Sequence, residues 1–369
     1  MANPLVGADV DFDNDNKRDI AYYRPSTGQC VVRETSNPTV DRVISLTGFD
    51  VNDIPMLGDY DGDGMTDCAV FRPGANVTGG ASAQWRWAAS GSGGAMQTDN
   101  FGWTGDLPIS DVRFRATSSA YGRYGVFRPS NHTFYWWTSS STFAAVQFGY
   151  TGDQLVLGDY DRDGWTDLAL WTPTTGSTPP AQSYFTIQYS ADNYASWHSW
   201  AWGQETDVPI GAVQHDDLDS APSSPLDFAV WRPSNGTWYY LMNPTITNTS
   251  GTASQQWGGA GDVPMPGYDI DLDGIEDEAI FRPAGSGAQI WYRRSGGSGM
   301  GYNVYNGGMT GDVVMWMPDE NGDNHPELLF YRRAGTPVGR LHRANSISGG
   351  TYSTFSWVAT TMVYSDLLL

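Results

Sequence analysis

The sequence predicts an all-β protein, a seven-bladed β-propeller with four antiparallel strands in each blade. Three observations predict this fold. A short phrase, in most copies an acidic loop that leads into an apolar strand, recurs seven times along the 369 residues. Aromatic residues make up 14% of the chain, which is typical of strands rather than of helices. The 44 Gly and 21 Pro residues supply the tight turns that many short strands need.

The repeated phrase sets the expected blade boundaries. Its clearest copies are Gly-Asp-Tyr-Asp-Gly-Asp-Gly-Met-Thr-Asp at 58–67 and Gly-Asp-Tyr-Asp-Arg-Asp-Gly-Trp-Thr-Asp at 158–167. A unit of this length cannot bury both faces of its own sheet, so neighbouring units must stack, and a two-sheet sandwich is disfavoured. The apolar strand starts, 44 to 60 residues apart, are Asp19, Asp67, Arg123, Asp167, Asp227, Asp277 and Glu327. We therefore expect a single propeller over 1–369, with blades at approximately 4–53, 54–106, 107–153, 154–207, 208–262, 263–312 and 313–369.

Each expected blade contains strands A to D in chain order. Strand A is a short apolar run such as 54–57, and the acidic loop follows it. Strand B reads Ala-Val-Phe-Arg at 69–72, and its small residue suits crowded packing between blades. Strand C is aromatic, as at 134–137, and strand D ends in Gln-Phe-Gly-Tyr-Thr-Gly-Asp at 147–153. Two segments compete for strand A of blade 1, residues 3–9 and residues 362–369, and both remain open.

The net charge of the chain argues against certain classes of partner. Only 20 Lys and Arg stand against 41 Asp and Glu, so the net charge is −21. Such a surface repels nucleic acid and anionic membranes. No run of 18 apolar residues is present, so we expect no membrane insertion. We also find no signal peptide, because Met1 and Ala2 run almost directly into the first repeat.

The two cysteines are too few to form a disulfide framework. Cys30 and Cys68 lie at different places in adjacent repeats, so a pair is allowed without being indicated. Neither has a His or Cys neighbour at metal-ligand spacing. We interpret both as small, buried, apolar residues.

The acidic loops have the chemistry of sites for a hard cation. In Asp-x-Asp-x-Asp-Gly-x-x-Asp, alternate carboxylates point at one centre, and the ninth-position carboxylate closes the cage at the start of strand B. An EF-hand closes three residues later and is flanked by helices, so that interpretation fails. The expected ligands are Asp11, Asp13, Asp15 and Asp19; Asp59, Asp61, Asp63 and Asp67; Asp159, Asp161, Asp163 and Asp167; Asp269, Asp271, Asp273 and Asp277; and Asp319, Asn321, Asp323 and Glu327.

Two blades depart from this pattern. Blade 3 has Arg115, Thr117, Ser119 and Arg123 at the four ligand positions, so we expect no calcium there. Instead, Arg123 is expected to supply a positive charge in place of the metal. Blade 5 has His215, Asp217, Asp219 and Asp227, with an insertion before the last of them, and is a weaker candidate.

These motifs resemble the FG-GAP/VCBS repeat family, the propeller type found in the heads of integrin α subunits. The resemblance covers nearly the whole chain, and its specific part is the acidic loop followed by an apolar strand and Arg-Pro. It implies a seven-bladed propeller with about five Ca²⁺ sites. Bacterial members are usually secreted binding modules, so the resemblance implies a bacterial protein that is secreted or at the cell surface. We expect it to be a monomer.

The face opposite the acidic loops is a candidate binding face. Trp103 and Tyr150 lie in D–A loops, with Asn131 and Asn235 in nearby turns. Flat aromatics beside amides and acids are typical of glycan recognition. An alternative for this face is structural, because Arg24, Arg72, Arg128, Arg232, Arg282 and Arg332 recur once per blade, as do Asp53, Asp106, Asp153, Asp207, Asp262 and Asp312. Each Arg is then expected to hold a D–A loop through an Asp, and Thr172 loses that contact.

The sequence favours a calcium-stabilised extracellular binding or adhesion module that engages a glycan, in lectin-like fashion, or an extracellular protein. One alternative is a propeller domain, catalytic or not, of a larger secreted hydrolase or lyase. Another is a purely structural surface scaffold. No nucleophile elbow, zinc-protease motif or phosphate loop is present, and the five His residues fall in different repeats. We therefore assign no catalytic residue.

Overall fold

The computed structural model describes a chain that is almost entirely β-structure. The described residues are 10–15, 19–37, 39–77, 80–91, 94–110, 112–117, 122–174, 181–213, 226–242, 251–266, 276–283, 288–293, 302–306, 312–317, 327–332, 340–345, 353–355 and 367–368. Within these ranges the only helical element is the single turn η1 (Ser190–Asp192). No helix in the described part of the chain is long and apolar enough to cross a membrane.

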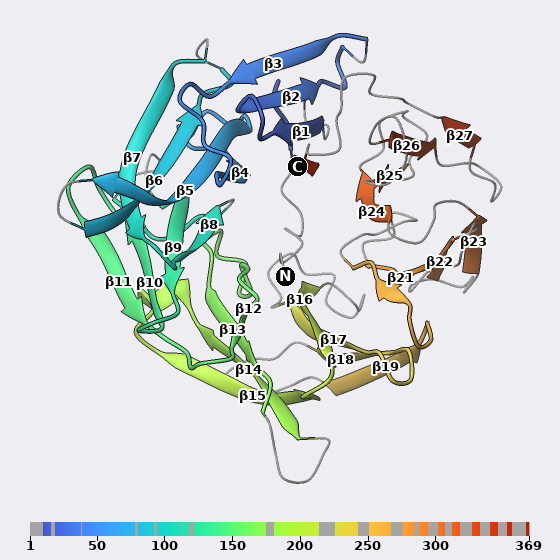
Figure 1. The fold of residues 1–369 in the computed structure, drawn as a ribbon. Helices are drawn as coiled ribbons and strands as arrows, with labels where there is room; N and C mark the ends of the chain where they lie inside the picture. The colour runs from blue at the N-terminus through green and yellow to red at the C-terminus, as the bar shows by residue number, and fades with distance from the viewer. Residues whose placement is uncertain are drawn as a thin grey trace. The chain divides into compact units, whose positions relative to one another are not determined.

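The chain divides into two compact units, one formed by residues 1–148, 331–341 and 357–369 and the other by 149–330 and 342–356. The first unit holds three four-stranded sheets, labelled in Figure 1. Blade 1 contains β1 (Ile20–Arg24), β2 (Gln29–Arg33), β3 (Asp41–Ser45) and β28 (Leu367–Leu368); blade 2 contains β4 (Ile54–Gly58), β5 (Asp67–Val77), β6 (Gly80–Ala88) and β7 (Met96–Trp103); and blade 3 contains β8 (Leu107–Ser110), β9 (Tyr124–Arg128), β10 (Thr133–Trp137) and β11 (Phe143–Gln147).

The second unit continues the same pattern of strands. Blade 4 contains β12 (Gln154–Leu155), β13 (Leu168–Thr172), β14 (Gln182–Gln188) and β15 (Trp197–Gln204); blade 5 contains β16 (Val208–Val213), β17 (Asp227–Arg232), β18 (Thr237–Met242) and β19 (Gly251–Gln256); and blade 6 contains β20 (Val263–Pro264), β21 (Glu278–Arg282), β22 (Gln289–Arg293) and β23 (Tyr302–Asn306). A further sheet, which includes residues of both units, joins β24 (Asp312–Met317), β25 (Glu327–Arg332), β26 (Arg340–Asn345) and β27 (Ser353–Phe355).

The all-β class and the four-stranded antiparallel propeller blade are therefore confirmed. Among the described strands, six sheets are built from four strands that follow one another in sequence. Blade 1 differs, because the C-terminal strand β28 pairs antiparallel with β1, with Leu368 opposite Tyr22 and Leu367 opposite Tyr23 (Figure 1). The tail thus takes the inner position of this blade, and the competing segment at 3–9 lies outside the described residues.

Sheets of the first unit pack against each other through apolar side chains. Tyr23 and Val32 of blade 1 share one buried cluster with Leu57 and Val70 of blade 2. The small strand B residue Ala69 is fully buried. At the same place in blade 3, a Cβ on Gly125 would lie 2.5 Å from the carbonyl oxygen of Tyr135, so no larger residue fits. The position is therefore crowded, and the close contact at Gly125 comes from its own blade.

The second unit is held together in the same way, with larger aromatics. Trp171 and Phe185 of blade 4 form one buried cluster with Phe228 of blade 5, and the rings of Phe185 and Phe228 stack at 5.0 Å. Trp231 of blade 5 clusters in turn with Ile280 of blade 6. Both faces of strand B are covered by neighbouring side chains. Strand B therefore has a continuous apolar sequence instead of alternating apolar and polar residues.

The interpretation of the cysteines as unpaired apolar residues was wrong. Cys30 on β2 and Cys68 on β5 form a disulfide between blades 1 and 2, with their Cα atoms 6.1 Å apart. Both are fully buried at the shared core. The two positions differ within the repeat, and stacking of one sheet on the next is what brings them together. The bond therefore links two blades covalently in addition to their apolar contact.

Candidate metal centres in the acidic loops

The acidic loop of blade 2 folds around its own first carboxylate. Asp59 Oδ1 accepts hydrogen bonds from the amides of Gly62 at 2.6 Å and Asp63 at 3.1 Å, and Oδ2 accepts one from Gly64 at 3.0 Å. Gly64 has φ +90°, a left-handed conformation that glycine adopts without strain. The alternating aspartates and the glycine thus close a tight turn with its carboxylates inside.

The ninth-position carboxylate joins this loop to the rest of the blade. Asp67 is fully buried, and its Oδ2 accepts a hydrogen bond from the amide of Tyr60 at 2.9 Å. Its Oδ1 accepts another from the amide of Ser90, in the loop between strands C and D, at 2.7 Å. Asp167 in blade 4 makes the same pair of contacts, with the amides of Tyr160 and Ser190, both at 2.8 Å.

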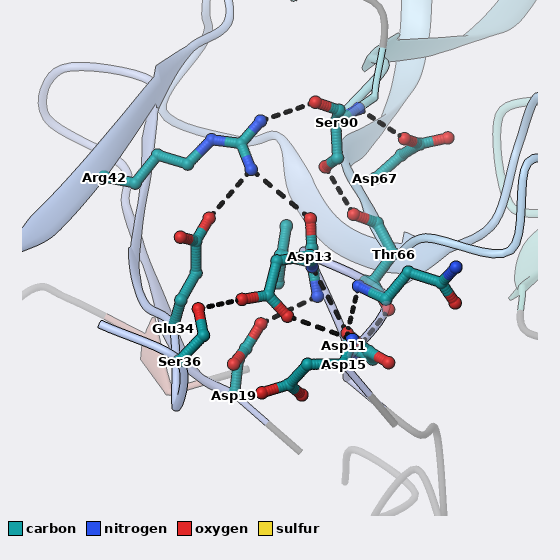
Figure 2. Close-up of polar contacts among 12 residues, drawn as sticks. Asp11, Asp13, Asp15, Asp19, Glu34, Ser36, Arg42, Thr66, Asp67 and Ser90 are labelled. Atoms are coloured by element: carbon teal, nitrogen blue, oxygen red, sulfur yellow. Dashed lines mark hydrogen bonds and ion pairs between the residues drawn. The ribbon is translucent and has the colours of Figure 1, made fainter. Parts of the chain in front are cut away.

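Asp19 closes the loop of blade 1 in the same manner. Its Oδ2 accepts from the amide of Phe12 at 2.7 Å, and its Oδ1 accepts from the amide of Thr35 at 2.8 Å. Figure 2 shows Asp11, Asp13, Asp15 and Asp19 gathered in this loop, with the Ser36 hydroxyl donating to Asp13. The three closing carboxylates therefore have one architecture.

In each of these loops, carboxylates of like charge converge. One oxygen from each member of three sets lies within 4.8 Å of the others, and the sets are Asp11, Asp13 and Asp15; Asp59, Asp61 and Asp67; and Asp159, Asp161 and Asp167. Asp63 and Asp163 were expected ligands but lie outside the sets; their Oδ1 atoms accept from the amides of Met65 and Trp165, both at 2.9 Å. Asp19 lies outside the set of blade 1.

The closing carboxylates have raised pKa values in these crowded, buried loops. The pKa values of Asp67 and Asp167 are raised from 3.8 to about 7, mainly by burial and also by neighbouring carboxylates, and the backbone hydrogen bonds only partly oppose this. For Asp19 the same causes raise the pKa to about 6. Burial also raises the pKa of Asp61, and the charges of Asp63 and Asp59 add to the effect. The hydrogen bond from the amide of Asp63 lowers this pKa, but by less. A cation in such a loop would replace the proton that burial favours.

The donor chemistry of the three sets suits one class of metal. Every converging atom is a carboxylate oxygen, which hard cations such as Ca²⁺ prefer over nitrogen or sulfur donors. Further oxygens lie close by, because Ser36 contacts Asp13 and the Ser190 hydroxyl donates to Asp163 at 3.0 Å. The alternation of aspartates in the sequence gives no indication of these hydroxyls from the C–D loops. Ser90 and Ser190 each follow their closing aspartate by 23 residues, a spacing that could have indicated the amide contact that they share.

The loops of blades 1 and 2 are connected directly. The amide of Asp11 donates to Thr66 Oγ1 at 3.0 Å, and the amide of Thr66 donates to the carbonyl of Asp11 at 2.6 Å (Figure 2). Arg42 adds a second bridge, donating to Glu34 at 2.9 Å and to the carbonyl of Ser90 at 2.6 Å. Neighbouring acidic loops therefore support each other through backbone contacts.

Several loop positions lie outside the described residues: the expected ligands Asp269, Asp271, Asp273, Asp319, Asn321 and Asp323, the weaker candidates of blade 5 (His215, Asp217 and Asp219), and Ser119 of blade 3. Of the remaining positions, Asp277 and Asp227 are buried at the start of strand B in their blades, as their counterparts are. Glu327 is the first residue of β25.

Arg123, expected to supply a charge within blade 3, lies against the loop of blade 2. Its Nη1 is 2.6 Å from Asp59 Oδ2. Asp59 is one of the three converging carboxylates of that loop. An internal cation therefore already contacts one of the three converging carboxylates.

The recurrent Arg and Asp residues form the expected ties in four blades. In each, the guanidinium donates two hydrogen bonds to the carboxylate, one from Nε to Oδ1 and one from Nη2 to Oδ2. The pairs are Arg72 with Asp53 (2.7 and 2.7 Å), Arg128 with Asp106 (2.8 and 2.9 Å), Arg232 with Asp207 (2.7 and 2.8 Å) and Arg282 with Asp262 (2.8 and 2.7 Å). In blade 4, where Thr172 replaces the arginine, Asp153 Oδ1 is buried without a hydrogen-bond partner. The structural interpretation of these positions is confirmed for the four blades.

The candidate ligand residues fall into two kinds. Trp103 and Tyr150 are 62% and 77% exposed, and they belong to different units. The amides of Asn131 and Asn235 instead hold their own turns, donating to Tyr135 Oη at 3.0 Å and Tyr239 Oη at 3.1 Å. The aromatics are thus open to solvent, while the amides already have an intramolecular acceptor.

Neither the models of known protein families nor the sequences of curated proteins give a match to this chain. The resemblance to FG-GAP/VCBS repeats therefore rests on the motifs in the sequence, and its propeller blades are the part that the structure supports.

Proposed function

We propose that this chain is a calcium-stabilised extracellular binding module, a seven-bladed propeller of the FG-GAP/VCBS type. The observation that carries the proposal is the convergence of carboxylate oxygens within 4.8 Å in three acidic loops of equal sequence spacing. Such a cluster is repulsive by about 1 to 4 kcal/mol per contact, depending on screening. A divalent cation with a preference for oxygen ligands removes that repulsion.

The proposed ring rests on the way in which blade 1 is completed. Its inner strand comes from the end of the chain, while the other sheets use consecutive strands. A mixed blade of this kind joins the two ends of a propeller and leaves no open sheet edge there. The proposed seven-bladed ring takes this mixed sheet as one of its blades.

An extracellular location is consistent with two features. Extracellular calcium is millimolar, which fills sites of the moderate affinity that short acidic loops provide. The buried Cys30–Cys68 disulfide is of the kind that persists in oxidising compartments.

Chelation tests the calcium part of the proposal. A site that binds only the folded state stabilises it by about 2.7 kcal/mol when calcium is at 100 times its Kd, and several sites add. We expect EDTA to lower the melting temperature strongly, and calcium, added in excess over the chelator, to restore it. Element analysis of the purified protein should find several calcium ions per chain. Identical melting curves in EDTA and in calcium would contradict the proposal.

The binding part concerns the exposed aromatics, for which a glycan or an extracellular protein is the proposed ligand. We expect a glycan array to report binding that Trp103→Ala removes, because an exposed indole stacks on the apolar face of a sugar ring. Trp197→Ala is the matched control, since Trp197 is 64% exposed against 62% for Trp103 and lies on β15 of blade 4. Equal loss of binding in both variants, or no glycan bound by the wild type, would contradict a lectin and leave a protein ligand.

A further inference from the structure

Blade 4 keeps the aspartate of the Arg–Asp tie without its arginine. The strand register places Thr172 there: Gln154 pairs with Trp171, so the preceding Asp153 lies opposite Thr172. In blade 5, Val208 pairs with Trp231 in the same way, and Arg232 binds the preceding Asp207. The same register recurs in blades 2, 3 and 6.

The intact blades show which group this carboxylate is built to hold. In each, the aspartate Oδ1 accepts a hydrogen bond from the arginine Nε. The Oδ2 accepts one from Nη2 and one from a loop amide, which in blade 5 is that of Gln204, at 2.9 Å. In blade 4 the loop amide is retained, because Tyr150 N donates to Asp153 Oδ2 at 2.7 Å. Asp153 Oδ1, which would receive Nε–H, is buried with no partner. A buried carboxylate oxygen without a hydrogen bond is unfavourable, and a planar two-pronged donor is the group that matches both oxygens.

Aromatic surface accompanies the guanidinium in the intact blades and is also present in blade 4. Arg232 lies 4.3 Å from the ring centre of Tyr239, and Arg128 lies 4.9 Å from that of Trp103. In blade 4 the register position of Tyr239 is taken by Thr186, and the aromatic side chain of Tyr184 is paired directly with Thr172 and is 36% exposed. Tyr150 occupies the place in its loop that Trp103 has in the preceding blade and is 77% exposed.

We propose that the Asp153 site, formed by Asp153, Thr172 and Tyr184, binds the guanidinium group of an arginine side chain supplied by an extracellular partner protein. The arginine would take the place that Arg232 fills in blade 5, with both prongs on Asp153 and its plane against an aromatic ring. Lysine offers no planar fork and fits the two oxygens less well. The inference rests on the proposed binding function and adds the chemical group that the partner would supply. It does not depend on calcium or on glycan binding.

The test uses the full chain and N-acetyl-L-argininamide as the probe, with its neutral citrulline counterpart as the control ligand. We expect the arginine probe to shift the amide NMR signals of Tyr150 and Gly152 in a saturable manner, and the citrulline probe to cause no saturable shift. Asp153→Asn should weaken binding at least tenfold. A citrulline probe that binds as tightly as the arginine probe would overturn the inference.

Two further variants exploit the repeat. Thr172→Arg should fill the site from within, so the probe no longer binds and the melting temperature rises. Arg232→Thr should create a second site at Asp207, with saturable shifts at Gln204. Binding to Thr172→Arg that equals the wild type, or no new site in a folded Arg232→Thr chain, would overturn the inference. A glycan array without hits would leave these results unaffected, so the two proposals fail separately.

Discussion

The acidic loops of blades 2 and 4 are two nearly identical sequences in different surroundings. Both begin with Gly-Asp-Tyr-Asp and close on a buried aspartate that is fixed by two backbone amides. In both, the first carboxylate caps the turn, since Asp63 N donates to Asp59 Oδ1 at 3.1 Å and Asp163 N donates to Asp159 Oδ1 at 3.0 Å. The motif alone thus determines the shape of the loop.

Two differences come from outside the motif. At the closing position of the blade that follows, blade 2 has Arg123, which contacts Asp59, whereas blade 4 has Asp227. After the closing aspartate, blade 2 has Cys68, which is bonded to blade 1, whereas blade 4 has Leu168. The neighbouring blade therefore determines which charge lies beside each loop and whether the loop's blade is covalently linked to another. The first prediction below concerns the motif that both loops share, and the other three concern what surrounds it.

The largest expected effect is a pH dependence that both loops share. The pKa values of Asp67 and Asp167 are raised to about 7 in the fold from 3.8, so the folded state binds these protons more tightly than the unfolded chain. Their contribution to stability is therefore full at low pH and is lost as pH rises from about 4 through 7. In EDTA, we expect the free energy of unfolding to be lower at pH 8 than at pH 5 by on the order of a few kcal/mol.

Denaturant titrations in EDTA across this range measure the effect. Asp67→Asn and Asp167→Asn should each remove a similar, large share of the pH dependence, because the two carboxylates have the same raised pKa, and Asp19 accounts for a smaller share. A metal-free protein that becomes more stable between pH 5 and pH 8 would show that these carboxylates are not buried as described.

The next effect separates the blades, because only the loop of blade 2 lies beside the disulfide. The bond closes a span of 38 residues, for which chain entropy gives roughly 4 kcal/mol of stability. Cys30→Ala with Cys68→Ala should therefore destabilise the protein by about this amount. Amide hydrogen exchange should accelerate more at Tyr60 and Ser90 than at Tyr160 and Ser190. Equal acceleration in both loops would mean that the disulfide does not act locally.

A somewhat smaller effect tests the closing carboxylates with calcium present. Asp167→Asn should cost about 2.7 kcal/mol of calcium-dependent stability at 100 times the Kd, since one site is lost. Asp67→Asn should cost less, because Arg123 already neutralises part of the charge of the loop in blade 2. Melting curves in calcium and in EDTA for both variants give the difference. An equal loss would show that Arg123 does not matter to the metal.

How much of this was predictable from the sequence depends on the range of the contacts. The blades and the three described acidic loops follow from local periods, the repeat and the alternation of aspartates, so they were predicted by residue number. The Arg–Asp ties were predicted because both partners recur once per blade. Thr172, which stands where the other blades have arginine, was the predicted exception, and Asp153 Oδ1 accordingly has no hydrogen-bond partner.

Contacts between blades could not be predicted in this way. Cys30 and Cys68 occupy different repeat positions, so only the stacking register of two sheets brings them together. Arg123 aligns with the ligands of its own blade but contacts Asp59 of the preceding one. Asp63 was expected as a ligand from the alternation, yet its Oδ1 accepts the amide of Met65 instead. A single sequence reveals the period of a repeat, but it says little about how one repeat is positioned in space against the next.

The smallest expected effect isolates Arg123 itself. A partly exposed ion pair is worth about 0.2 to 1 kcal/mol, so the arginine weakens calcium binding at blade 2 by no more than severalfold. Arg123→Gln removes the competing charge from Asp59 and leaves an uncharged polar side chain in its place. Calcium affinity at blade 2 should rise about two- to fivefold, and metal-free stability should fall slightly.

Amide NMR signals of Gly64 and Gly164 can follow the two loops in one titration, since each amide donates to the first carboxylate of its own loop. The Gly64 midpoint should move to lower calcium in Arg123→Gln, while the Gly164 midpoint stays in place. Arg123→Lys is the matched control, because it retains the charge and should leave both midpoints near the wild type. If Arg123→Gln instead weakens binding at Gly64, the arginine organises the loop for the metal, and the difference between the blades is one of geometry rather than of charge.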